Sequence, residues 1–205
     1  MKRIPLISLF TCCLFFILNW PQTAEAQLER ERAIPDAPVS DVFWSGLNVG
    51  LSTVHNQQAG DLNTSVLHTF GLVEGGVDRF WGLDDGANTR IGLYYGITDR
   101  LSAGIGRMTF NNVVDLQSKY NILRQTRDNS VPLELAVKVF TGITTQDGIG
   151  LDFSERLTYF ASVMIARKFN RLSLQLSPMM AHFNRPLSAA DQDQLFGLGI
   201  LVNVE

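Results

Sequence analysis

The residue types that could support catalysis are few in this sequence, and they are widely separated. There are three histidines, His55, His68 and His182, and neither a Gly-x-Ser-x-Gly nor a His-Glu-x-x-His motif. A serine triad requires a nucleophile, a base and an acid within hydrogen-bonding reach of one another. His68 and His182 fall near the ends of expected strands, where packing or interfacial roles are commoner than catalysis. We therefore expect no enzyme activity, no cofactor and no metal site.

Carboxylates gather in two stretches that read as loops. One is Asp84-Asp85-Gly86, and the other contains Asp147, Asp152 and Glu155. Oxygen-rich loops can hold calcium, but neither stretch has the spacing of an EF-hand. We interpret both as solvated loops.

A further set of charged residues occupies the less apolar positions of expected strands. Six of them would point inward in a barrel: Arg90, Arg107, Asp115, Lys119, Glu134 and Lys138. Side chains fill the interior of a small barrel, which favours a cross-lumen network of ion pairs. The alternative is that these residues line a narrow pore.

Their placement depends on a period-two pattern. In residues 131–139, Val131, Leu133 and Leu135 fall on one face, while Glu134 and Lys138 fall on the other, which is typical of a β-strand. Eight strands are expected in all, at residues 62–70, 88–96, 101–108, 115–122, 131–139, 157–166, 172–182 and 195–204. No helical period is sustained after residue 26, so we expect an all-β fold.

The pattern does not by itself say which face meets water, but other features favour a transmembrane barrel over a soluble one. The expected strands are about as long as tilted membrane strands. Glycines often occupy the less apolar face, and aromatic residues gather near strand ends, as in interfacial girdles. Long connections at 71–87, 143–155 and 184–194 alternate with short turns at 97–100 and 167–171, although 109–112 is short on the long side. Residues 42–54 break this alternation, so we treat them as a periplasmic or lumenal segment.

The N-terminus has the design of a secretory signal. Lys2 and Arg3 precede an apolar stretch at residues 4–20, and Ala24-Glu25-Ala26 matches a signal-peptidase site. The competing interpretations are a retained membrane anchor and lipidation at Cys12 or Cys13. Cleavage after Ala26 would leave no cysteine, and hence no disulfide and no thiolate chemistry. The domain organisation is then a signal peptide at 1–26, a periplasmic linker at 27–41 and a barrel at 42–205.

Three runs of residues carry a resemblance to a known family. They are His68-Thr69-Phe70-Gly71, the stretch from Tyr95 to Arg107 that contains Gly96-Ile97-Thr98-Asp99-Arg100, and the stretch from Lys119 to Gln125. Taken in order, they resemble an outer-membrane β-barrel family of Gram-negative bacteria that is known only as a domain of unknown function. The resemblance covers about 41–205 and implies a location and a fold, not an activity. Family members continue for several more strands, so we favour a chain truncated relative to its relatives over an eight-stranded barrel that closes.

The sequence therefore predicts an antiparallel, up-and-down transmembrane β-barrel in the outer membrane, with a structural role or a role in the passage of small solutes. Its expected partners are outer-membrane lipid and the barrel insertion machinery. A formal net charge of −3 provides no basic surplus for phosphate backbones, so nucleic acid is not expected. The alternatives are a soluble periplasmic β-barrel that binds an apolar ligand, and a barrel enzyme that acts on lipid or peptide.

Overall fold

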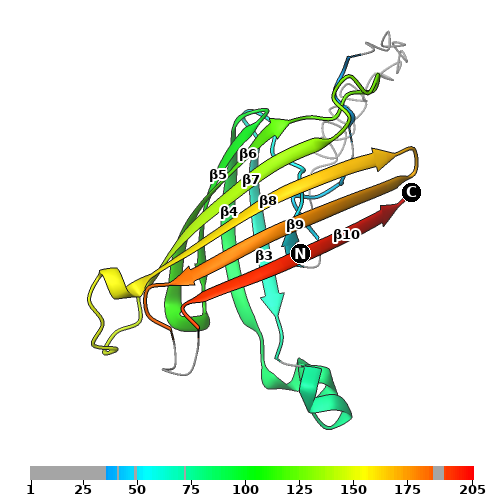
Figure 1. Cartoon of the computed structure of the whole chain (residues 1–205). Coiled ribbons are helices and arrows are strands. Elements are labelled where there is room, and N and C mark those ends of the chain that lie inside the picture. The colour runs from blue at the N-terminus through cyan, green and yellow to red at the C-terminus, as the bar shows by residue number, and fades with distance from the viewer. Residues whose placement is uncertain (1–35, 41, 49, 72, 187–191) are drawn as a thin grey trace, which may run out of the picture. The chain divides into compact units, whose positions relative to one another are not determined.

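The computed structural model describes residues 36–205, except residues 41, 49, 72 and 187–191 (Figure 1). The chain divides into two units, Met1–Ala33 and Ile34–Glu205, and the description below concerns the second. The predicted signal peptide and most of the predicted linker lie outside the described residues. Among the described residues, no helix is long and apolar enough to cross a membrane.

The second unit is built on one antiparallel sheet of eight strands (Figure 1). Each strand pairs with its neighbour in the sequence, in the order β10-β9-β8-β7-β6-β5-β4-β3. The strands are β3 (Leu62–Thr69), β4 (Asn88–Thr98), β5 (Leu101–Met108), β6 (Val113–Leu123), β7 (Glu134–Thr144), β8 (Leu157–Phe169), β9 (Leu172–Phe183) and β10 (Gln194–Val204). The predicted all-β, up-and-down arrangement is confirmed, and each expected strand has a counterpart.

One strand starts later than the alternation predicted. Val131 does not belong to β7, because its N–H donates to Thr126 Oγ1 and its carbonyl accepts from the Thr126 N–H, at 3.0 Å in both cases. Pro132, which has no N–H to donate to a strand partner, follows in the same turn. The regular pairing of β7 with β8 therefore begins at Glu134.

The long connections lie at one end of the sheet, which we call the loop end. The connections at this end contain the 3-10 segments η1 (Val73–Asp85), η2 (Phe110–Asn112) and η3 (Ser154–Arg156), and the connection that holds η2, at 109–112, is the short exception that the sequence indicated. The opposite end, the turn end, carries the two-residue turns between β4 and β5 and between β8 and β9, together with the longer connection 124–133. The predicted alternation of connections is thus present, with 124–133 longer than the other turns.

The two faces of the sheet have opposite characters. The inner face, which we define as the one covered by residues 42–58, buries polar side chains: Arg90, Ser102, Asp115, Gln117, Asn121, Glu134, Ser162, Ser173, Gln175 and Ser177. The outer face exposes large apolar ones: Ile91, Leu93, Ile105, Leu116, Val139, Val163, Ile165, Leu174, Leu176, Leu198, Ile200 and Val202. A soluble protein does the reverse, whereas a transmembrane barrel has this distribution.

Residues 42–58, which we call the lumenal segment, cross the inner face and do not join the sheet. A small hairpin of β1 (Leu47–Asn48) and β2 (Leu51–Ser52) lies within them. Val42, Phe43 and Val54 pack with residues of the inner face in a small apolar cluster, which also contains Ala136, Met164, Ala166 and Leu201. Of the two placements expected for residues 42–54, the lumenal one is therefore observed.

The sheet is open within the described residues. β3 and β10 are its two edges and do not pair with each other, so the eight strands form a half-barrel (Figure 1). Closure at eight strands, which was the alternative from the sequence, is therefore not seen in the part of the chain that the structure describes.

Candidate lumenal site

Five of the six charged residues expected in the lumen lie on the inner face, and one does not. Arg90, Asp115 and Glu134 are buried there, and Lys119 and Lys138 are partly buried. The expectation for Arg107 was wrong. The register of β5 is unbroken from Leu101 to Arg107, so strict alternation that places Gly106 inward must turn Arg107 outward. Arg107 is exposed near the loop end, where its Nη1 donates to Thr145 Oγ1 at 3.3 Å.

The strongest charged contact of the inner face joins β4 to β6. Arg90 donates from Nε to Asp115 Oδ2 at 2.8 Å and from Nη2 to Asp115 Oδ1 at 2.6 Å, a bidentate pair. Its Nη1 also donates to the Tyr94 hydroxyl at 2.6 Å. Gly106 on the intervening strand makes room for this pair, because a Cβ there would lie 2.2 Å from Arg90 Nη2. The guanidinium and carboxylate thus neutralise each other inside the half-barrel.

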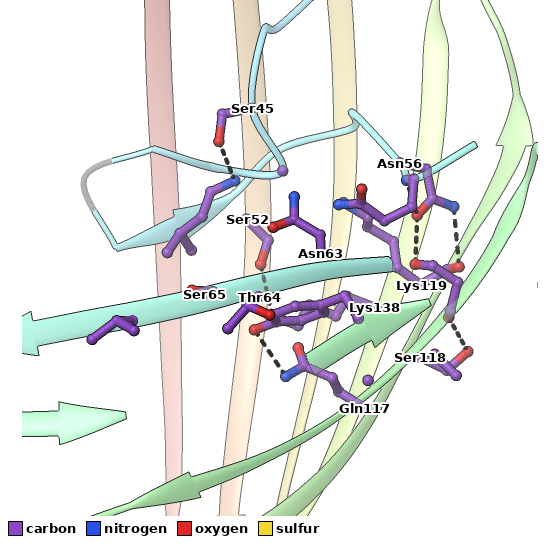
Figure 2. Close-up of a pocket in the computed structure, with 18 residues that line it drawn as sticks. Ser45, Ser52, Asn56, Asn63, Thr64, Ser65, Gln117, Ser118, Lys119 and Lys138 are labelled. Carbon is purple, nitrogen blue, oxygen red and sulfur yellow. Dashed lines mark hydrogen bonds between the residues drawn. The ribbon is translucent and has the colours of Figure 1, made fainter. Parts of the chain in front are cut away.

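Two lysines of the inner face hold the lumenal segment, and Figure 2 shows the contact of one of them, Lys138, with Ser52. Lys119 Nζ donates to the carbonyl of Thr53 at 3.2 Å and to that of His55. Lys138 Nζ donates to Ser52 Oγ at 2.8 Å. Both ammonium groups therefore have roles in securing residues 52–55 as well as in lining the lumen.

Uncharged amides complete this attachment, and the sequence analysis did not single them out. Gln175 accepts from the Val54 N–H at 2.9 Å and donates to the Ser52 carbonyl at 2.8 Å. Asn121 Nδ2 donates to the Val54 carbonyl and to Glu134 Oε1, both at 2.8 Å. One signal could have identified them. Both are amide side chains at inward positions of strands, and the backbone of the lumenal segment needs hydrogen-bond partners because it does not join the sheet.

A polar cavity of about 400 Å³ lies between the lumenal segment and strands β3 to β7 (Figure 2). Hydroxyl and amide groups dominate its wall, including those of Ser45, Asn63, Thr64 and Gln117. Lys119 and Lys138 add two ammonium groups. Such a wall can exchange hydrogen bonds with a small polar solute and attracts negative charge.

The histidines and acidic loops form no cluster in the described part of the chain. His68 Nδ1 contacts Thr89 Oγ1 at 3.1 Å, and the ring of His182 stacks on that of Tyr159 with centroids 6.3 Å apart. Among the residues described, no three His, Cys, Asp or Glu side chains gather in a way that could hold a metal ion. The geometry therefore directs attention to the lumen.

Comparison with known protein families identifies the family of this chain. A family model described as "Membrane bound beta barrel domain (DUF5777)" matches residues 43–205. This range contains the ten strands found among the described residues and nearly all of the lumenal segment. Searches of curated proteins and of solved structures returned no match.

Proposed function

Because the chain belongs to this family of membrane-bound β-barrel domains of unknown function, we propose that it is an outer-membrane protein through which small polar solutes pass. The observation that carries the proposal is the inner face, where a polar cavity adjoins a segment held by reversible hydrogen bonds. A purely structural barrel would gain nothing from such a cavity, because packed side chains would fill its interior.

The location part of the proposal rests on the outer face and on the predicted signal peptide. An exposed apolar face of this extent matches lipid, and a cleaved signal would bring the chain across the inner membrane to the barrel insertion machinery. Cell fractionation combined with a heat-modifiability gel tests it. The protein is expected to remain in the outer-membrane fraction and to migrate differently when it is not boiled. Release without detergent would instead favour the soluble, apolar-ligand alternative.

Conductance in planar bilayers tests the passage of solutes. The full chain, folded into lipid, is expected to conduct, and K119E or K138E is expected to shift its ion preference toward cations, since each replaces an ammonium of the cavity wall with a carboxylate. Arg107→Gln is the matched control, because it removes a charge from the outer face and should leave the preference unchanged. Silent bilayers from a heat-modifiable, folded protein would overturn the proposal and leave a structural role.

No enzymatic step is part of this proposal. A barrel enzyme acting on lipid or peptide would need a nucleophile, a base and an acid together, and neither the sequence motifs nor the described contacts of His68 and His182 supply such a set. Nucleic acid is not a proposed partner either, because the chain is weakly acidic.

A further inference from the structure

A second cavity, of about 690 Å³, lies at the loop end of the inner face and has a different lining. Its wall is formed largely by apolar side chains from five strands: Leu67, Met108, Phe140, Phe160 and Phe183. Toward the turn end, the inner positions of the same sheet are mainly polar, with Ser102, Asn121, Glu134, Ser162 and Ser173. The apolar residues there, Ala136, Met164, Ala166 and Leu201, pack with Val42, Phe43 and Val54 of the lumenal segment. The inner face therefore has an apolar zone that lines a cavity at the loop end and a mainly polar zone toward the turn end.

This division requires a reason, because a water-filled lumen does not favour large apolar side chains. Phe140, Phe160 and Phe183 are half-buried at inward positions, and no residue of the lumenal segment beyond Leu47 and Gly50 reaches the cavity in the described structure. Binding sites for small molecules are mostly apolar, with a few polar groups that fix orientation, and they have volumes of roughly 300–1,000 Å³. The cavity fits that description.

One group of polar side chains lines the cavity where the two zones meet. Arg90, Tyr94, Gln117 and Lys138 line this part. Arg90 is already paired with Asp115, so the remaining positive charge comes from Lys138. An ammonium has three N–H donors. In the described structure, Ser52 Oγ accepts one from Lys138, which leaves donor capacity toward the cavity.

The mouth of the cavity, near the loop end, is also cationic. Arg156 and Arg185 both line it, and Glu155 is the carboxylate there, in an ion pair with Arg185 at 3.1 Å. Arg156 donates to the carbonyls of Leu151 and Gln146, which leaves its charge unbalanced by a carboxylate in these contacts. Positive charge at the mouth attracts anions, and positive charge at the base can hold them.

We propose that this cavity binds a small amphiphilic anion, with its hydrocarbon part among the phenylalanines and its carboxylate against Lys138. The inference rests on the proposed function and extends its solutes from polar molecules to amphiphilic anions. The apolar wall of the cavity would stabilise a hydrocarbon chain by removing it from water. A charge-assisted hydrogen bond from Lys138 would fix the position of the carboxylate. Medium-chain carboxylates such as octanoate have this chemistry.

Equilibrium dialysis of radiolabelled octanoate against the full chain in lipid nanodiscs tests the inference. Empty nanodiscs serve as the blank, because octanoate also partitions into lipid. Saturable binding above the blank is expected. Octanol should compete at least about tenfold more weakly, because it lacks the carboxylate that pairs with Lys138. Absence of saturable binding, or equal competition by octanol, would overturn the proposal.

Paired variants locate the site. K138Q is expected to weaken octanoate binding about tenfold or more, and K138R is expected to retain most of it. R107Q is the matched control, because Arg107 is exposed on the outer face and lines neither cavity, and its binding should equal that of the parent. F160A is expected to weaken octanoate and octanol together. An equal effect of K138Q and R107Q would exclude the proposed site.

The outcome is separable from that of the conductance experiment. Octanoate binding by a protein that is silent in bilayers would support the cavity and refute passage, whereas conductance without octanoate binding would refute the cavity alone. Heat modifiability of every variant shows whether it has folded. If K138Q fails to fold, the comparison of octanoate with octanol on the parent protein still decides the role of charge.

Discussion

The two faces of the sheet differ sharply in the chemistry of their side chains. Asp115 is 1% exposed on the inner face, and the next residue, Leu116, is 64% exposed on the outer face. Gln175 is 2% exposed, while its neighbours Leu174 and Leu176 are 40% and 43% exposed. A soluble β-protein would reverse the chemistry of these positions. The comparison shows that the side chains of each strand in this membrane-bound domain alternate between two environments, hydrocarbon on the outer face and a polar interior on the inner face.

The largest loss of stability is expected when a charge is removed from the inner face. Asp115→Ala would leave the Arg90 guanidinium buried without its carboxylate, so we expect the free energy of unfolding to fall by about 3–5 kcal/mol. Urea titration of the barrel in lipid vesicles measures the change. Arg107→Gln, on the outer face near the loop end, is the control and should cost far less. Equal losses in the two variants would mean that the Arg90–Asp115 pair is solvated.

The next test places a charge on the outer face. Val163 lies in the middle of β8, where a lipid-facing lysine would sit far from either membrane surface. We expect Val163→Lys to cost about 2–4 kcal/mol in the same titration, because an ammonium is poorly solvated in hydrocarbon. Val163→Leu keeps the position apolar and should be close to neutral. If the lysine variant were as stable as the leucine variant, the outer face would not be in lipid.

A smaller effect is expected where the inner face holds the lumenal segment. Gln175→Ala would remove the partners of the Val54 N–H and the Ser52 carbonyl, at a cost of about 1–3 kcal/mol for each group that stays dry. Hydrogen exchange at the Val54 amide should accelerate, since the segment then opens more readily. Ser177→Ala removes a hydrogen-bond partner of Gln175 but neither of its contacts with the segment, and should leave that exchange rate nearly unchanged. Unaltered exchange in Gln175→Ala would show that packing alone retains the segment.

The smallest effect concerns the loops, which belong to neither face. The Asp152 backbone N–H, and then the Arg185 guanidinium, hold the pKa of the Glu155 carboxyl below its ordinary value. Because the folded pKa is depressed, this contact stabilises the loop above the unfolded pKa and is lost as pH falls through the folded pKa. Arg185→Gln should raise the pKa of Glu155 part of the way toward its ordinary value, as followed by carbon NMR of the carboxyl. Asp128, whose pKa is lowered by Thr126 and Ser130, should not move.

The strands were predictable because period-two alternation, glycine placement and connection lengths are all local signals. The contacts of the inner face were not. Arg90 and Asp115 are 25 residues apart on strands separated by β5, and no local pattern joins them. Gln175 meets Val54 across 121 residues, which requires knowing that the lumenal segment lies on the inner face. Arg107 was misplaced because its charge was given more weight than the alternation that Gly106 already fixed.

Gly96 lies where the lumenal segment approaches the sheet too closely for any side chain. Its N–H donates to the Asp61 carbonyl at 2.9 Å and its carbonyl accepts from the Gly60 N–H at 2.8 Å, directly under the turn that leads into β3. A Cβ at this position would lie 1.8 Å from the Gln58 carbonyl oxygen. Any larger residue must therefore be accompanied by a displaced turn. Among relatives of this chain, we expect a residue larger than glycine at position 96 only where the length or conformation of residues 57–61 also differs.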